Sequence, residues 1–390
     1  MHPESSHIFG SSSRWRLSSW YFCYFALIGA FSPYFTLYLR SLGFAAAAIA
    51  ILMSLMSAMR LVAPNLWGWL ADRSGRTMAV LRASAVLSMI GFLGLFFAAT
   101  FWPVFAAMAA MAFFWSAALP LVEALTLRHL DGQAELYGRV RMWGSIGFIA
   151  AVLGTGACLD RTSITSLLWI ILAMLLGIVA CTWLITDPPS LPASRNFAPR
   201  GRLDRPEVVA LLAAGFFMSA AHGPFYVFYS IHLVGHGYDK TAIGVLWSLG
   251  VVAEIAVFVA MPRILKSWSI RAILLTSFVA AILRFLMIGW LADIFVVLLV
   301  GQAMHGATFG AHHAASVSAI NEWFAPGQQA RVLALYGSVS FGAGGMLGNL
   351  LGGVSWDMFG PGVTFSWAAV LAAVGMVLIW RGMRAGCPVR

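Results

Sequence analysis

The charged side chains that stand inside otherwise apolar stretches are the first candidates for chemistry in this sequence. Each would cost about 3 kcal/mol at the centre of a hydrocarbon layer if it were alone, so each needs a partner or a wet cavity. Glu123 and Arg141 are equally far from the predicted turn between their helices, and so are Glu254 and Arg284. We therefore expect two acid–arginine pairs, which could bind an anion or a polar ligand and move protons.

Histidines are the second candidates, because their side chains gain and lose protons near neutral pH. His222 lies in one apolar stretch, and His305, His312 and His313 lie in another. His305 and His312 are seven residues apart, which predicts one shared helical face. The cluster favours proton handling, with simple packing as the alternative. No carboxylate accompanies it in sequence, so we expect no metal site.

The elements that carry these residues must be membrane helices. The chain has 390 residues, of which 61% are hydrophobic and only 10% charged, and its mean hydropathy is +0.86. A helix needs about 20 apolar residues to cross a bilayer. The predicted fold class is an all-α polytopic membrane protein with twelve spans, at 17–39, 46–70, 77–99, 102–127, 139–159, 165–186, 206–233, 241–264, 270–291, 292–319, 331–356 and 362–382.

The net charge of +10 reports membrane orientation rather than nucleic-acid binding. Seventeen of the 24 Lys and Arg residues fall on one side of the predicted spans, and only Arg40, Arg161 and Lys240 fall on the other. By the positive-inside rule both termini lie in the cytoplasm. Arg82 is close enough to a helix end to snorkel to the interface. Arg60 receives no role.

Two pairs of segments repeat in the same order. PYFTLYLRSLGF at 33–44 recurs at 224–238, and YGRVRMWGSIGF at 137–148 recurs at 330–341. The two copies of each segment are about 191 to 194 residues apart, roughly half the chain. This offset predicts two parallel membrane halves. The expected organisation is a cytoplasmic tail at 1–16, a six-helix half at 17–186, a cytoplasmic linker at 187–205, a second six-helix half at 206–382 and a tail at 383–390.

The sequence GWLADRSGRT joins the second and third predicted spans. A glycine for close helix approach, an acid at a helix end and arginines on a tight turn would form a charge clasp on one side of the membrane. The segment resembles the signature loop of the major facilitator superfamily. The resemblance implies a gating role for its charged and glycine residues, namely Gly68, Asp72, Arg73, Gly75 and Arg76.

Further segments resemble particular families within that superfamily. Glu123 and Arg141, in LPLVEALTLRHLDGQAELYGRVRM, match the sugar-binding pair of lactose permeases in type and spacing. The segments GVLWSLGVVAE at 244–254 and HGATFGAHHAA at 305–315 are similar to the phenylpropionate permease family, relatives of nucleoside–proton symporters. At Thr308 the sequence departs from lactose permeases, in which a proton-carrying Glu is expected. The resemblance implies proton-coupled uptake of an aromatic monocarboxylate such as 3-phenylpropionate.

We accordingly expect a secondary transporter, not an enzyme, in a bacterial inner membrane, working as a monomer with a small-molecule substrate, protons and no cofactor beyond the proton gradient. The alternatives are a sugar or nucleoside symporter, an exporter, or, from another class, a membrane-embedded enzyme or a nutrient sensor. The expected substrate-binding residues are Glu123, Arg141, Trp143, His222, Tyr226 and Arg284, and the expected proton-coupling residues are Glu254, His305 and His312.

Overall fold

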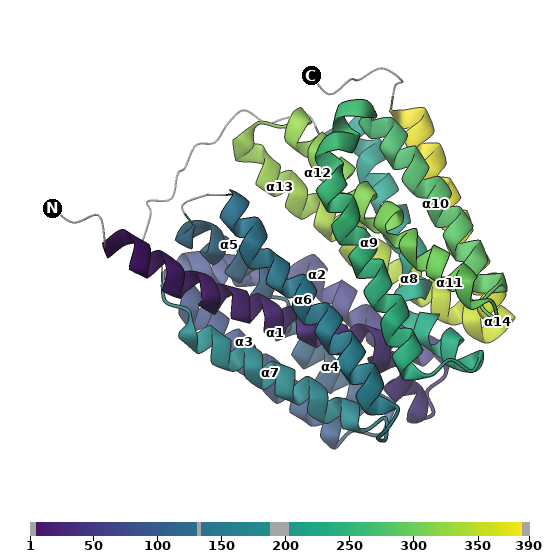
Figure 1. Ribbon diagram of the computed structural model, residues 1–390, viewed down its shortest axis with the longest axis horizontal. Helices are drawn as coiled ribbons and strands as arrows, with labels where there is room; N and C mark the ends of the chain where they lie inside the picture. Colours follow the sequence, from purple (N-terminus) through teal and green to yellow (C-terminus); the bar gives the residue numbers. More distant parts are fainter. Residues whose placement is uncertain (1–4, 131–133, 188–202, 384–390) are drawn as a thin grey trace. The chain divides into compact units, whose positions relative to one another are not determined.

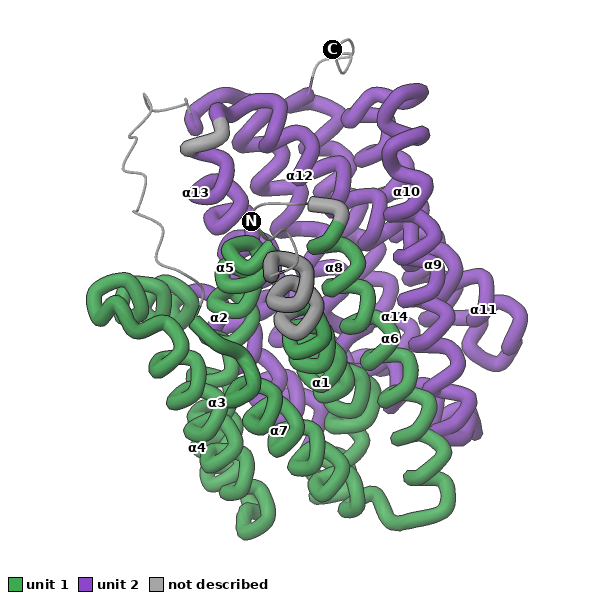
Figure 2. The backbone as a smooth tube through the Cα atoms, turned by 60° about the vertical axis from the view of Figure 1, so that its left-hand side comes forward, with its two compact units in different colours: residues 1–44, 62–192 green, residues 45–61, 193–390 purple. Residues whose placement is uncertain are grey.

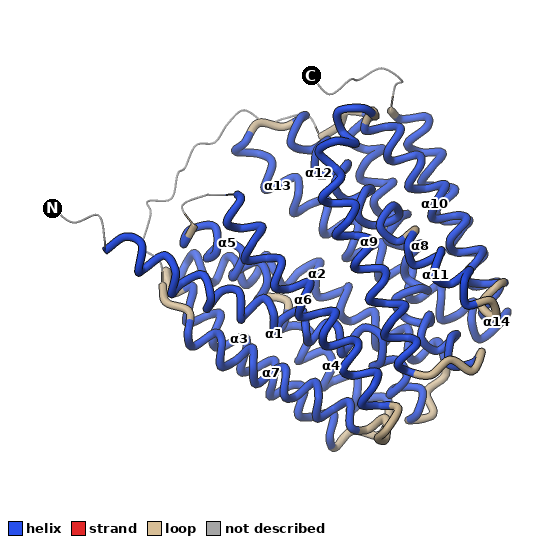
Figure 3. Tube along the Cα trace, in the orientation of Figure 1, coloured by secondary structure: helices blue, strands red, loops and turns tan. Residues whose placement is uncertain are grey.

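Helices make up every regular element that the computed structural model describes, and loops of a few residues join most of them (Figure 1, Figure 3). The described residues are 5–130, 134–187 and 203–383. The elements are α1 (Ser5–Ser41), α2 (Ala46–Ser74), α3 (Thr77–Leu93), η1 (Gly94–Phe96), α4 (Phe101–Trp115), α5 (Ala118–His129), α6 (Ala134–Leu159), α7 (Ser166–Leu184), α8 (Pro206–Gly235), α9 (Lys240–Ser267), α10 (Ile270–Trp290), α11 (Phe295–Ala303), η2 (Gly306–Ala311), α12 (His312–Trp323), α13 (Pro326–Gly337), η3 (Ser338–Gly344) and α14 (Gly345–Gly382).

Ten helices of the described chain are long and apolar enough to cross a membrane. Two local features reconcile this number with the twelve predicted spans. The tenth predicted span is broken into α11, η2 and α12, where η2 is a π-helix. The last two spans form one run, Gln328–Gly382, which turns at Gly360 with φ of 79° just before Pro361. The all-α polytopic prediction is therefore confirmed.

The chain begins its first helix earlier than predicted. Residues 1–16 were expected to be a tail, but α1 already begins at Ser5. Most of the predicted tail is therefore helical, and its place outside the membrane stays a prediction. The final predicted tail and most of the predicted linker, residues 384–390 and 188–202, lie outside the described residues.

The chain divides into two compact units, coloured separately in Figure 2. Unit 1 comprises residues 1–44 and 62–192, and unit 2 comprises residues 45–61 and 193–390. This division differs from the predicted halves in one respect. The first part of α2, residues 45–61, belongs to unit 2, whereas the sequence repeat assigned it to the first half.

The beginning of α2 shows how unit 2 holds this segment. The backbone N–H groups of Ala46 and Ala47 donate hydrogen bonds to the carboxylate of Asp357 on α14, at 3.1 and 2.8 Å. At the repeat-related start of α9, Asp239 caps its own helix by accepting a bond from a backbone N–H at 2.7 Å. Ala45 stands at the equivalent position and has no oxygen to offer, so α14 supplies the carboxylate that the helix start requires.

The backbone reproduces the repeat seen in the sequence. Gly43 follows α1 with φ of 85°, and Gly237 follows α8 with φ of 82°. Both adopt the left-handed conformation that ends a helix and favours glycine. The second repeated segment differs between its two copies, because residues 137–148 lie in the continuous helix α6 while residues 330–341 pass from α13 into the π-helix η3.

Close contact between α8 and α14 in unit 2 depends on small residues. A Cβ at Gly348 would overlap the carbonyl oxygen of Ala220, and one at Gly344 would overlap that of Phe216. On the opposite helix, a Cβ at Gly223 would overlap the backbone of Gly348. Such small-residue interfaces let membrane helices approach closely, and here glycines of α8, η3 and α14 provide the contact.

This packing predicts a position-dependent effect of alanine. Gly348→Ala should lower the thermal unfolding midpoint of the detergent-purified protein, because overpacking typically costs about 1–3 kcal/mol. The control is Gly154→Ala on α6, where a Cβ would meet no atom within 4 Å. Equal midpoints for the two variants in scanning fluorimetry would contradict the packing argument.

Candidate functional site

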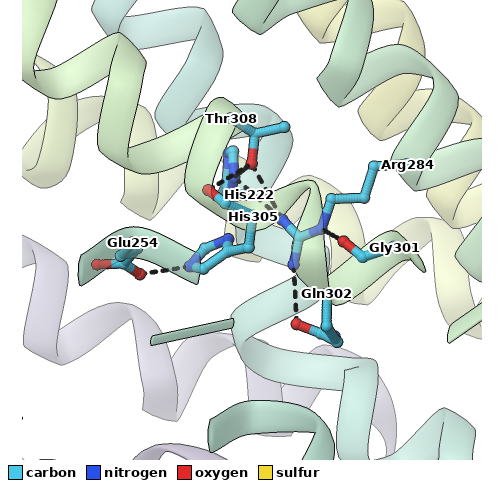
Figure 4. A network of polar contacts seen from close by, with 7 residues as sticks. All are labelled: His222, Glu254, Arg284, Gly301, Gln302, His305 and Thr308. Carbon is cyan, nitrogen blue, oxygen red and sulfur yellow. Dashed lines mark hydrogen bonds and ion pairs between the residues drawn. The ribbon is translucent and has the colours of Figure 1, made fainter. Parts of the chain in front are cut away.

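Arg284 on α10 is the centre of a buried polar network in unit 2 (Figure 4). Its side chain is 0% exposed. The guanidinium donates to the Gly301 carbonyl at 2.8 Å, to Gln302 Oε1 at 3.4 Å, and from Nη1 to both Thr308 Oγ1 at 3.3 Å and His222 Nε2 at 3.4 Å. These four acceptors are neutral groups.

The hydrogen bonds of His222 define its tautomer. Nδ1 lies 2.8 Å from the Met218 carbonyl oxygen, one turn back on α8, and only an N–H can bond to that oxygen. Nε2 is then the acceptor for Arg284, because a neutral imidazole carries one proton. His222 is thereby fixed as a neutral acceptor facing the guanidinium.

Glu254 on α9 meets a histidine. Its Oε1 lies 2.8 Å from His305 Nε2, with side chains 18% and 7% exposed respectively. The sequence predicted Arg284 as the direct partner of Glu254, and the structure places His305 in that position instead. Glu254 and Arg284 still share one network, because Thr308, an acceptor for Arg284, also donates to the His305 carbonyl at 3.3 Å.

The π-helix η2 separates His305 from His312. A π-helix has a wider turn than an α-helix, so residues seven apart do not return to the same face. His305 faces Glu254 on α9 and the Phe225 ring at 5.6 Å, whereas His312 packs edge-on to Phe278 of α10 at 5.3 Å. The expectation that the two histidines share one face is therefore wrong.

Aromatic rings from α8 and α9 surround the network. The Arg284 guanidinium lies 4.2 Å from the centroid of the Phe225 ring, a cation–π contact. Tyr226 lies 6.1 Å from the His222 ring, and Trp247 lies 4.9 Å from Phe225 with its indole N–H bonded to Ser230. Tyr226 thus lies beside the polar network, as its predicted role requires.

Unit 1 holds a second, simpler polar cluster. Pro120 cannot donate a backbone hydrogen bond, and the helix is interrupted just before it, between α4 and α5. Glu123, one turn after Pro120 on α5, accepts a bond of 3.4 Å from Tyr137 on α6. Arg141, one turn beyond Tyr137, places its guanidinium 3.9 Å from the Phe25 ring centroid on α1. The cluster offers a carboxylate, a guanidinium and an aromatic face.

Trp143 lies away from this cluster. It follows Arg141 by two residues, about 200° around an α-helix. Its side chain is 46% exposed and lines a groove with Arg139 and residues of α1. The structure therefore does not place Trp143 with Arg141, as the predicted substrate-binding role requires.

Three residues of these clusters went unassigned in the sequence. Gln302 is buried in the structure. Its polar amide within a predicted apolar span was a signal in the sequence that could have indicated a site residue. Thr308 was noticed only as a departure from the permease pattern. Phe25 resembles every other aromatic residue of an apolar helix, and only the fold shows that it lies against Arg141.

The predicted gating loop forms a tight turn at the end of α2. Gly75 has φ of 63°, and its N–H bonds to the Ala71 carbonyl, which explains the need for glycine. Arg73 stacks over Trp69 at 5.4 Å, and Asp72 and Arg76 are exposed. A Cβ at Gly68 would meet no atom within 4 Å, so the close helix approach predicted there is not observed.

Metal binding finds no support among the described residues, where no three His, Cys, Asp or Glu side chains gather closely enough to hold an ion. Long apolar helices with a buried, charge-bearing polar network are typical of secondary transporters. Residues 14–367 match the model of the MFS_1 like family, and the chain belongs to that family.

Similar proteins agree with this class. A probable 3-phenylpropionic acid transporter of Escherichia coli is 28% identical over 382 residues, covering 93% of this chain and 96% of its own. A maltose permease of Geobacillus stearothermophilus is 26% identical and covers 92% of both chains. The crystal structure of the nucleoside transporter NupG superposes with a TM-score of 0.81 at 17% identity, covering 96% of this chain and 99% of its own.

The network around Arg284 predicts a specific sensitivity to lysine. Arg284→Lys should lower thermal stability, since an ammonium cannot reach four separate acceptors and a buried group left unpaired costs about 1–3 kcal/mol. The control is Arg82→Lys on α3, where the half-buried guanidinium donates to the Ile185 carbonyl. A variant as stable as the control would contradict the bonding scheme, with the unfolding midpoint as the measurement.

Proposed function

We propose that this transporter takes up an aromatic monocarboxylate together with protons, by alternating access of its binding site. It would do so in a bacterial inner membrane, as a monomer with both termini in the cytoplasm. The observation that carries the proposal is a fully buried guanidinium, Arg284, whose observed hydrogen bonds go to neutral acceptors. A buried cation that is bonded only to neutral groups should bind an anion, because neutral acceptors offset only part of the free energy lost on desolvation.

The carboxylate of the substrate suits Arg284 chemically. A guanidinium presents paired donors that match the two oxygens of a carboxylate, and such charge-assisted bonds are stronger than bonds to neutral amides or hydroxyls. The substrate would replace the bonds to Gln302 and Thr308, which at 3.4 and 3.3 Å are longer than the 2.8 Å bond to the Gly301 carbonyl. Tyr226 and Trp247 would pack against the aromatic ring.

Proton coupling follows from the neighbouring acid. Glu254 is the negative charge bonded to His305, and His305 connects to Arg284 through Thr308. Protonation of Glu254 would remove a negative charge from the network and leave Arg284 in greater need of an anion. A proton and a carboxylate would thus bind favourably together, and the loaded network would carry little net charge.

Uptake by proteoliposomes tests the substrate and the driving force. Purified protein should accumulate labelled 3-phenylpropionate above equilibrium when a proton gradient is directed inward, and only equilibrate when an ionophore removes the gradient. Protein-free liposomes are the control, because the neutral form of an aromatic acid permeates bilayers and a pH gradient alone accumulates its anion on the alkaline side. Uptake that is equal with and without the gradient would contradict proton coupling.

Glu254→Gln tests the proton carrier. The amide keeps the shape of the side chain and cannot gain or lose the proton, so substrate exchange should persist while gradient-driven accumulation disappears. Glu322→Gln, an exposed acid on α12, should leave both activities unchanged. Accumulation by Glu254→Gln at the rate of this control would remove Glu254 from the mechanism.

A sugar or nucleoside is the second candidate substrate, favoured by the cluster in unit 1. The Glu123 carboxylate and the Arg141 guanidinium could bind hydroxyl groups. The Phe25 ring beside Arg141 could pack on the apolar face of a ring. Competition decides between the two. Excess maltose or uridine should leave phenylpropionate uptake unchanged if the acid is the substrate, and should inhibit it if unit 1 binds the natural ligand.

A further inference from the structure

A groove of about 720 Å³ lies between α1 and α6 of unit 1, and neither Glu123, Arg141 nor Phe25 is among the residues that line it. These helices lie side by side and run in the same direction (Figure 1, Figure 2). The Tyr34 hydroxyl on α1 donates to the Val152 carbonyl on α6. Nine residues earlier on α1, Phe25 lies against Gly144, which is eight residues earlier on α6. The early residues of α1 therefore lie level with the early residues of α6.

The lining of the groove combines polar and apolar side chains. Arg14 and Arg139 supply guanidinium groups, and Ser18 and Ser19 supply hydroxyls. Phe22 is among the apolar residues. The lining of α1 extends from Arg14 to Cys23, about 13 Å at the rise of an α-helix. That length exceeds a single aromatic acid and suits a headgroup followed by the upper part of an acyl chain.

The groove adjoins an exposed face of α6. Arg139, Met142, Trp143 and Ile146 recur at helical spacing along one side of α6, and all four are exposed, the last three at 53%, 46% and 40%. An exposed apolar stripe on a membrane helix is a surface that acyl chains can cover. An arginine at the end of such a stripe, with tryptophans beside it, is the usual arrangement at the membrane–water interface.

We propose that this groove binds an anionic phospholipid, with its phosphate between Arg14 and Arg139 and an acyl chain along Phe22 and Trp143. Basic pockets between membrane helices bind anionic headgroups, and each arginine near such a surface strengthens binding. Trp15, 51% exposed, flanks the headgroup end. The site is independent of the transported substrate and of proton coupling.

Native mass spectrometry of the full-length protein tests the site with phosphatidylglycerol and phosphatidylcholine as probes. The wild-type protein should retain phosphatidylglycerol in preference to phosphatidylcholine. Each Arg removed should weaken the tightest phosphatidylglycerol adduct about fivefold, so the double variant Arg14→Gln/Arg139→Gln should lose the preference at one site. The matched control Arg263→Gln/Arg331→Gln removes two exposed arginines outside the groove and should keep it.

Equal losses in both double variants would show diffuse attraction and overturn the site, as would a wild type without any preference. A second measurement does not depend on the folding of these variants. Phosphatidylglycerol brominated near the top of its acyl chain should quench tryptophan fluorescence more than brominated phosphatidylcholine does. Trp143→Phe should abolish most of that difference, and a difference that survives in this variant would place the lipid elsewhere.

Discussion

The candidate site in unit 2 depends on the hydrogen bonds of one guanidinium that is buried away from water. Arg284 needs acceptors on several sides, and they come from α8, α11 and η2. A buried ion loses several kcal/mol of hydration, so every element that supplies an acceptor must keep its position. The local fold and the affinity for an anion therefore depend on the same contacts. The neutral acceptors stabilise the cation, but they do not neutralise its charge.

Backbone packing sets the positions of these acceptors. His222 is followed directly by Gly223, which lies against Gly348 of α14 without space for a side chain. The closeness of the two helices fixes the rotation of α8, and this rotation turns His222 and Phe225 towards Arg284. Glycine contacts at the helix interface and charge chemistry at the site are therefore parts of one arrangement.

Much of this organisation could be predicted from the sequence. Long apolar runs indicated the spans, and the repeat anticipated the matching left-handed glycines Gly43 and Gly237. The partner of Glu254 and the faces of the site histidines could not be predicted. The face of His312 depends on the π-helix η2, which changes the rotation of the helix after His305, and side-chain periodicity does not record this change. The pairing of Glu254 with His305, which precedes η2, depends on how α9 packs against this part of the chain. Trp143 was predicted to lie with Arg141 and does not, because proximity in sequence does not determine which face of the helix a residue occupies.

Helix α2 belongs to both compact units, with the boundary between Leu61 and Val62. Shortly after it Pro64 offers no N–H to the carbonyl of Arg60, so the helix lacks a backbone bond where it passes from one unit to the other. Its first turn is meanwhile clamped by the carboxylate of Asp357. The first half of α2 also packs along unit 2, where Ala50 lies against Gly353 and Leu61 against Gly342. The missing backbone bond therefore falls directly after the part of α2 that unit 2 holds in place, and this is where the helix bends most easily.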